Sequence, residues 1–330
     1  IDMLKLGIRL ANSINSGRGH FERCFSISNH ISQKIIWFLD YESDFFESRI
    51  AKKDEIFYEE KNNDLKLVNS FIKNQKINFL LLDSYIFSKE TINNLAKKIP
   101  LCLFQDKKDN YNIQMVICPH PIVLEVSNNQ VCLNGPKFAP ISNKLMIDNK
   151  KSKNDNKNIL ISMGAYDSLG VTLNVMKAVD NIAKRIKTNI KTTIVLANGS
   201  PIIEEVNLFI KNSINFKLLV NVKDMSKIYN NNTIAIGAPG LSHLERLYIG
   251  LPTILIAQNK IHELLVEKWV HLNCALKSKN TISMIEKTIC YIIASKKVRN
   301  ELIRNGRKQV DGKGSIRIAK SILMYNKKYD

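Results

Sequence analysis

The chain of 330 residues lacks the long apolar runs that a membrane-spanning protein needs. No uninterrupted hydrophobic segment approaches the ~20 residues that cross a bilayer as a helix. The first residues (IDMLKLGIRL) also lack a basic segment followed by a long apolar region and a small-residue cleavage site. We therefore expect no signal peptide, no stable membrane insertion and a cytoplasmic location.

Cysteine pairs at metal-binding or redox spacing are missing as well. The 6 cysteines are scattered and none forms a C-x-x-C motif, which argues against a disulfide framework and against a zinc site. Cys118 and His120 form one close cysteine–histidine pair, but no second pair of ligands accompanies them. The sequence therefore predicts neither a metal site nor a cofactor.

Acidic residues are scarce relative to basic ones. Lysine and arginine number 49 against 30 aspartates and glutamates, a formal net charge of +19. The lysines are spread along the chain, with one denser stretch from Lys296 to Lys328, whereas a nucleic-acid-binding protein concentrates arginine and aromatic residues on one surface. We expect a solvated basic surface and no nucleic-acid partner. The charge also attracts nucleotide diphosphates and favours weak association with an acidic membrane surface.

Short apolar segments alternate with helical patterns through both halves of the chain. The strands predicted in the first half are Leu4–Leu10, Ile35–Leu39, Phe79–Leu82, Leu101–Phe104 and Met115–Ile117, with helices near Gly19–Ser32, Asp64–Asn74 and Lys89–Lys98. The strands predicted in the second half are Ile159–Met163, Thr193–Leu196, Phe216–Val220, Thr233–Ile236 and Thr253–Ile256, with helices at Val171–Ile186, Ile202–Asn212 and Leu241–Ile249. Such alternation indicates parallel sheets that helices cover on both faces.

A wholly polar decapeptide, residues 149–158 (NKKSKNDNKN), separates the two halves. It predicts an exposed linker between residues 1–148 and residues 159–330, the second part ending in a helical tail from Ile261 onward. We expect the α/β fold class, with two doubly wound parallel-sheet (Rossmann-like) domains facing across a cleft. Ligands of such folds bind outside the carboxyl ends of the strands.

A glycine-bracketed turn, Gly17-Arg18-Gly19, leads from the first predicted strand into a helix that starts near His20. Glycine allows the backbone to approach a ligand, and the free N–H groups at a helix start favour an anion. Imidazole titrates near neutral pH, so His20 can act as a general base beside a bound phosphate or sugar. The alternative is a histidine that only caps or packs at the helix start.

A second glycine turn, from Gly237 to Gly240, leads from a predicted strand into a helix. Backbone N–H groups at Gly240, Leu241 and Ser242 can hold a diphosphate at the helix N-terminus. Glu245 can accept hydrogen bonds from both ribose hydroxyls, or it can merely favour the helix dipole. Together the two turns predict a ligand-binding cleft, with the nucleotide bound by the second domain.

Six motifs, in the correct order, resemble those of the PseG family, which hydrolyses a UDP-linked diacetamido-trideoxy sugar in pseudaminic acid biosynthesis. The first turn (GRGHFERC) resembles the family's G-x-G-H-x-x-R-C, and Asp83-Ser84-Tyr85 resembles its D-x-Y after a strand. The remaining matches are Gly135–Ala139 (GPKFA), Ile159–Asp167 (ILISMGAYD), Gly237–Glu245 and Asp311–Arg317 (DGKGSIR).

The resemblance implies a GT-B-like fold and hydrolysis of the anomeric C–O bond, with release of UDP and free sugar. The catalytic residues that it implies are His20, Tyr85 and Asn259. The substrate-binding residues that it implies are Gly17, Gly19, Arg23, Gly164, Gly237, Gly240, Leu241, Ser242 and Glu245. The chain departs from the family pattern at Ala165, at Pro239-Gly240-Leu241 and at Lys260, which bears on the identity of the sugar.

Two other functions fit the same cleft. A GT-B glycosyltransferase of the MurG type would use a UDP-amino sugar donor and would need an acceptor pocket in the N-terminal domain. A non-catalytic nucleotide-sugar binding protein would have no need of a base at the anomeric carbon. We favour the hydrolase over both, because His20 and Tyr85 are present.

Overall fold

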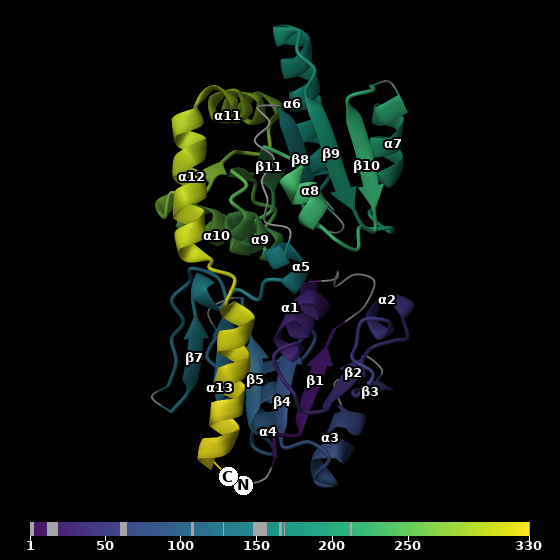
Figure 1. Ribbon diagram of the computed structural model, residues 1–330, viewed down its shortest axis with the longest axis vertical. Helices are drawn as coiled ribbons and strands as arrows, with labels where there is room; N and C mark the ends of the chain where they lie inside the picture. The colour runs from purple at the N-terminus through teal and green to yellow at the C-terminus, as the bar shows by residue number, and fades with distance from the viewer. Residues whose placement is uncertain are drawn as a thin grey trace. The chain divides into compact units, whose positions relative to one another are not determined.

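The computed structural model describes residues 3–11, 19–59, 65–106, 109–127, 129–147, 157–164, 167, 169–211 and 213–329. The chain divides into two compact units, the first made of Ile1–Ser142 and Gly312–Asp330 and the second of Asn143–Asp311 (Figure 1). Each unit is built on one parallel sheet, which confirms the prediction of two parallel-sheet α/β domains. In the described part of the chain, no helix combines the length and the apolarity needed to cross a bilayer.

The sheet of the first unit has seven strands in the order β3-β2-β1-β4-β5-β6-β7, and all neighbouring pairs are parallel. The strands are β1 (Leu6–Leu10), β2 (Ile35–Leu39), β3 (Glu55–Tyr58), β4 (Phe79–Asp83), β5 (Leu101–Phe104), β6 (Met115–Cys118) and β7 (Val131–Asn134). The winding direction reverses between β1 and β4, where Leu10 pairs with Asp83. In doubly wound sheets such a switch point marks the ligand site, outside the carboxyl ends of the strands.

Helices cover both faces of this sheet, because alternate residues of its strands bury apolar side chains on opposite sides. On β2, Trp37 packs against Phe21 of α1, with ring centroids 6.0 Å apart, whereas the adjacent Phe38 packs against Phe71 of α3 at 5.2 Å. The helices of the first unit are α1 (Gly19–Ser28), α2 (Asp44–Glu47), α3 (Lys66–Lys73), α4 (Lys89–Ala96), the short 3-10 helix η2 (Pro136–Phe138) and α13 (Gly314–Tyr329).

Helix α13 belongs to the first unit, where Figure 1 shows it in yellow. Its residues buried in the core that α1 and β1 also form are Ile318, Ala319 and Ile322. The chain can approach this closely only with glycine at the start of α13, because a Cβ on Gly314 would overlap the backbone of Ala139. The predicted boundaries differ here, since they placed the whole of residues 159–330 in the second domain.

The second unit has six strands in the order β10-β9-β8-β11-β12-β13, again all parallel. The strands are β8 (Asn158–Ser162), β9 (Lys191–Leu196), β10 (Phe216–Val220), β11 (Ile234–Gly237), β12 (Thr253–Leu255) and β13 (Leu276–Lys277). The switch point lies between β8 and β11, where Gly237 pairs with Ser162. Of the predicted linker, residues 149–156 lie outside the described residues, and Asn158 already begins β8.

The helices of the second unit are α5 (Asn143–Ile147), α6 (Val171–Ile186), α7 (Ile203–Lys211), α8 (Ser226–Asn230), α9 (Leu241–Ile249), α10 (Lys260–His271), α11 (Ile282–Ala294) and α12 (Lys296–Gln309). On one side of the sheet, α6 and α11 pack together and share a core with β8 and β11. Elsewhere in the unit α9 contacts α12, and His243 of α9 meets Trp269 of α10 edge-on at 5.2 Å. These layers hold the start of α9 at the switch point.

Candidate active site

Two residues beside the switch point of the first sheet form a buried pair. His20 lies in the first turn of α1, which follows β1, and Asp83 is the last residue of β4. Nδ1 of His20 lies 2.6 Å from Oδ1 of Asp83, and the two side chains are only 6% and 0% exposed. When Nδ1–H donates to the carboxylate, Nε2 carries the lone pair of the neutral ring. In enzymes that use a base–carboxylate pair, the carboxylate orients the imidazole in this way.

Arg23, one helical turn after His20, bridges two carboxylates. Its Nε and Nη2 donate to Asp83, and its Nη1 lies 3.2 Å from Oδ2 of Asp106. The guanidinium also lies over the ring of Phe104, 4.3 Å from the centroid. Burial lowers the pKa of Arg23, but Asp83 and Asp106 outweigh it and hold that pKa well above its usual value. The ion pairs of Arg23 are thus with carboxylates of the protein, and its binding of substrate stays a prediction.

Both carboxylates remain ionised although they are buried. Burial raises the pKa of Asp83, but Arg23 and His20 outweigh this effect and bring it below the ordinary value. At Asp106, Arg23 and His120 likewise outweigh burial and lower the pKa of the carboxyl. With neutral imidazoles, the cluster has two negative charges against one positive charge.

Tyr85 and His120 complete this cluster. The Tyr85 hydroxyl donates to Asp106, and its ring meets the ring of His20 edge-on, with centroids 4.8 Å apart. Nε2 of His120 lies 3.6 Å from Oδ1 of Asp106. The sequence motifs did not point to Asp106 or His120 as site residues. A signal was present, however, because both follow strands whose carboxyl ends share one sheet edge with the end of β4.

In the second unit, the turn from Gly237 to Gly240 connects β11 with α9 beside the switch point. Gly237 has no room for a side chain, because a Cβ would come within 2.7 Å of Nη1 of Arg246 and closer still to a backbone oxygen of β8. Gly240, by contrast, has φ −74° and open space where its Cβ would be. Packing therefore requires glycine at position 237, whereas position 240 leaves space above the turn.

Glu245 and Arg246 hold the start of α9, which begins with Leu241 and Ser242. Oε2 of Glu245 accepts a hydrogen bond from the buried Tyr229 hydroxyl at 2.7 Å. Arg246 is fully buried and donates through Nη2 to the backbone oxygen of Ala238 at 2.7 Å, while Nη1 lies 3.4 Å from Oγ of Ser242. Burial lowers the pKa of Arg246 below its usual value, and the opposing effects of the neighbouring Tyr229 and Glu245 offset this only in part. Through its hydrogen bond to Ala238, Arg246 holds the turn between β11 and α9 from the buried side.

The other predicted site residues lie at element ends. Gly164 follows β8 with φ +99°, a conformation that glycine adopts readily. Oδ1 of Asn259 caps α10 by accepting the N–H of His262 at 2.8 Å, and its catalytic role stays a prediction. Gly19 is the first residue of α1, and Gly17 lies outside the described residues. Among the described side chains, no three His, Cys, Asp or Glu residues are grouped to hold a metal ion.

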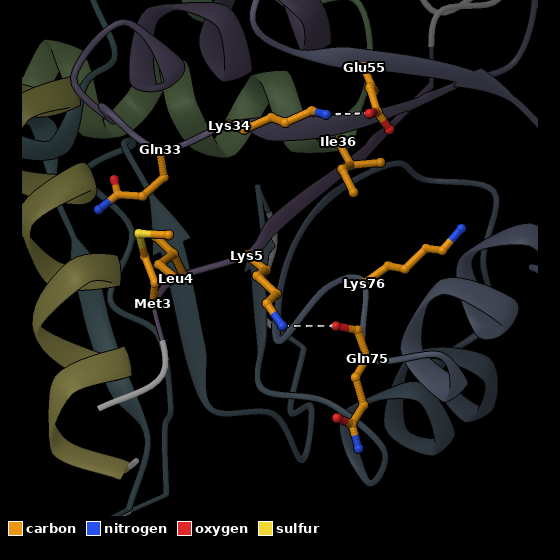
Figure 2. A pocket seen from close by; sticks show the side chains of 9 residues that line it. All are labelled: Met3, Leu4, Lys5, Gln33, Lys34, Ile36, Glu55, Gln75 and Lys76. Atoms are coloured by element: carbon orange, nitrogen blue, oxygen red, sulfur yellow. Dashed lines mark hydrogen bonds and ion pairs between the residues drawn. The ribbon is translucent and has the colours of Figure 1, made fainter.

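A pocket of about 520 Å³ lies at the amino-terminal edge of the first sheet, away from the His20 cluster (Figure 2). Figure 2 shows that two of its lysines already bind protein groups. Lys34 pairs with Glu55, and Nζ of Lys5 donates to the backbone oxygen of Gln75 at 3.2 Å. Doubly wound sheets bind ligands at the opposite, carboxyl-terminal edge. We therefore place the candidate active site at the His20 cluster.

Sequence comparison identifies distant relatives. No family model matches the chain. The uncharacterized protein MJ1062 of Methanocaldococcus jannaschii is 26% identical over 283 residues, which are 78% of this chain and 56% of that protein, so the chain spans about half the length of this relative. The spore coat polysaccharide biosynthesis protein SpsG of Bacillus subtilis is 22% identical over 96% of both chains.

Solved structures resemble the chain over almost its whole length. The S. aureus MnaA–UDP co-structure has a TM-score of 0.73 at 11% identity and covers 98% of this chain and 97% of its own. The UDP-GlcNAc 2-epimerase from Neisseria meningitidis, bound to UDP-GlcNAc, has a TM-score of 0.70 at 12% identity and covers 97% of this chain and 100% of its own. MurG from Acinetobacter baumannii has a TM-score of 0.62 at 13% identity and covers 97% of this chain and 99% of its own. The chain therefore has the two-sheet GT-B fold of these nucleotide-sugar enzymes.

Proposed function

We propose that the chain is a cytoplasmic hydrolase that cleaves the anomeric C–O bond of a UDP-linked diacetamido-trideoxy sugar, in biosynthesis of the pseudaminic acid type. The single observation that carries the proposal is the buried His20–Asp83 pair at the switch point of the first sheet. The resemblance of the motifs around His20, Tyr85 and Glu245 to those of the PseG family supports it. The shared fold with proteins solved with UDP or UDP-GlcNAc supports it further, as does the similarity to SpsG, a spore coat polysaccharide biosynthesis protein.

In this proposal His20 is the general base. Asp83 holds Nδ1–H, so Nε2 takes a proton from water while the water oxygen bonds to the anomeric carbon. The bond from that carbon to the diphosphate oxygen breaks, and its electron pair leaves with UDP. General-base catalysis contributes roughly 10²–10⁴-fold, and holding the water and the sugar in place contributes more. The proton that His20 gains offsets the surplus negative charge of Asp83 and Asp106.

The proposal assigns the nucleotide to the second unit. Backbone N–H groups at the start of α9 bind the diphosphate, whose negative charge grows as the C–O bond breaks. Gly240 lets the diphosphate approach the backbone because its Cβ position is open. Glu245, held by the Tyr229 hydroxyl, accepts hydrogen bonds from the ribose hydroxyls.

Product release in plain buffer tests the reaction type. Purified protein is incubated with a UDP-diacetamido-trideoxy sugar in the presence of a chelator and without any acceptor. We expect UDP and free sugar in equal amounts, because water is the acceptor and the scheme uses no metal. A UDP-sugar isomer without free UDP would contradict hydrolysis and indicate an epimerase.

The second candidate is a GT-B glycosyltransferase of the MurG type with a UDP-amino sugar donor. The observation that favours it is the fold shared with MurG over 97% of this chain. A transferase needs its acceptor to complete the nucleophile site and releases sugar to water only slowly. UDP release that stays negligible until a carbohydrate or lipid acceptor is added would establish this candidate in place of the hydrolase.

A further inference from the structure

A second imidazole–carboxylate pair lies beside the His20–Asp83 pair. Asp106 follows β5 and His120 follows β6, and Nε2 of His120 is 3.6 Å from Oδ1 of Asp106. His120 is only 3% exposed, and its Nδ1 has no hydrogen-bond partner among the described residues. One general base suffices for the proposed hydrolysis. The burial of a second histidine in the same cluster therefore requires a separate explanation.

The surroundings of His120 favour the neutral ring. Burial lowers the pKa of His120, and Arg23 lowers it as well, against the opposing effect of Asp106. The nearby thiol of Cys118, which donates to the backbone oxygen of His120 at 3.9 Å, is itself protonated because burial raises its pKa to about 12. In a neutral imidazole the nitrogen that faces a carboxylate carries the proton, because a lone pair there would repel the oxygen. The Nε2–H of His120 therefore faces Asp106, in a polar contact of 3.6 Å that is longer than an ordinary hydrogen bond.

Asp106 is held by three groups from three different elements. Nη1 of Arg23 approaches from α1, the Tyr85 hydroxyl from the segment after β4, and Nε2 of His120 from the segment after β6. The carboxylate is the acceptor for the Tyr85 hydroxyl, which also lies 3.4 Å from Nη2 of Arg23, and the Tyr85 ring meets the ring of His20. The orientation of Tyr85 beside His20 thus depends in part on where Asp106 is held.

We propose that His120 is a positioning residue: by holding Asp106 it fixes the Tyr85 hydroxyl, which in turn orients a hydroxyl or acetamido group of the sugar beside His20. This inference rests on the proposed function, because it assumes that a sugar binds at the His20 cluster. It assigns His120 no contact with the reacting atoms. Removing the His120 N–H donor should therefore act through Tyr85 alone.

Kinetics test the path from His120 to Tyr85. We expect His120→Phe to lower kcat about three- to tenfold with little change in KM, because it removes one buried polar contact to Asp106. His120→Gln should recover most of this loss, because its amide N–H can take the place of Nε2–H. In a Tyr85→Phe background, His120→Phe should have almost no further effect. Full additivity of the two substitutions, or unchanged kcat in His120→Phe, would overturn the inference.

Nitrogen NMR of the histidine rings gives a readout that needs no activity. In the ligand-free protein at neutral pH we expect the His120 ring to be neutral with its proton on Nε2. Tyr85→Phe should shift the His120 ring signals, whereas the control Tyr291→Phe, an exposed tyrosine of the second unit, should not. A proton on Nδ1 of His120, or His120 ring signals that do not change in Tyr85→Phe, would refute the path from His120 through Asp106 to Tyr85. This conclusion would hold even if no UDP-sugar were hydrolysed. An inactive wild type with the expected NMR result would instead count against the proposed function alone.

Discussion

Nδ1 of His20 lies 2.6 Å from Oδ1 of Asp83, although 63 positions separate the two residues in the chain. Parallel pairing of β1 with β4, in which Leu10 lies opposite Asp83, brings them together. The polar pair is buried at the edge of an apolar sheet, where an unpaired carboxylate would be strongly unfavourable. The pair is therefore held by the fold itself and is available before any ligand binds.

The first prediction distinguishes the basic nitrogen of His20 from its hydrogen bond to Asp83. His20→Asn keeps an N–H near the position of Nδ1 but has no basic nitrogen, so we expect loss of UDP release by at least about 10²-fold. UDP affinity should stay within a few-fold, because a base contributes little to ground-state binding. Turnover assays and calorimetry measure the two effects, with the exposed His271→Asn as the control. Near wild-type turnover in His20→Asn would mean that His20 is structural.

The second prediction concerns acid unfolding. Because the folded-state pKa values of Asp83 and Asp106 lie below those of the unfolded chain, their ionised forms contribute stability above about pH 4. This stability is lost as the pH falls below about 4 toward the folded-state pKa values, by up to about 1.4 kcal/mol per pH unit for each proton. Asp106→Asn should lower the free energy of unfolding at pH 7 and flatten its decline toward pH 3. Denaturant titrations at several pH values measure this slope.

A surface aspartate provides the control for that experiment. Asp180 pairs with the exposed Lys184 on α6, so Asp180→Asn should leave the free energy of unfolding nearly unchanged at pH 7. If Asp106→Asn behaves like Asp180→Asn, the charge cluster does not stabilise the fold.

The third prediction uses two glycines of one turn. Gly237→Ala should destabilise the protein by about 1–3 kcal/mol, because its Cβ would collide with Arg246 and the backbone of β8. Gly240→Ala should change stability by no more than about 0.5 kcal/mol, since its φ of −74° and open surroundings accept alanine. Only UDP affinity should fall, about tenfold, because the methyl group occupies ligand space. Unchanged affinity in Gly240→Ala would exclude close approach of a diphosphate.

The fourth prediction tests the ribose contact. Glu245→Ala should weaken UDP binding by about 1.5–3 kcal/mol through loss of charge-assisted hydrogen bonds. Tyr229→Phe removes only the hydroxyl that orients the carboxylate and should weaken binding less. Calorimetry with UDP measures the affinity of both variants. If Glu245→Ala binds UDP as tightly as the wild type, Glu245 does not bind the ribose and only interacts favourably with the helix dipole.

Sequence patterns predicted the central strands better than the edges. The bounds of Ile35–Leu39 and Leu101–Phe104 agree with β2 and β5, because short apolar runs are typical of buried parallel strands. One edge strand, β10, was also predicted with its bounds, Phe216–Val220. The edge strands β3, β7 and β13 were not predicted. Residues of β3 and β13 are partly or fully exposed, and β13 has only two residues, so their apolar signal is weak.

For the site, local motifs identified what lies within one turn of the chain. His20 and the glycines of both turns were found because glycine and histidine next to a strand end form a recognisable pattern. Asp106 and His120 were not, because each is an isolated residue whose meaning depends on β4, β5 and β6 being neighbours. Arg246 was missed since a charged helix residue is usually solvated, whereas here it is fully buried behind a turn.

The place of α13 in the first core has a consequence for how the protein is made. Its buried residues Ile318, Ala319 and Ile322 leave the ribosome after all of Asn143–Asp311, and so does Tyr325, whose ring meets that of Phe79 of β4 at 5.8 Å. While the second unit is being synthesised, the nascent first unit exposes the apolar surface that α13 later covers. The unit that carries His20 thus begins folding first and is completed last, and in the interval its uncovered core is open to aggregation or to a chaperone.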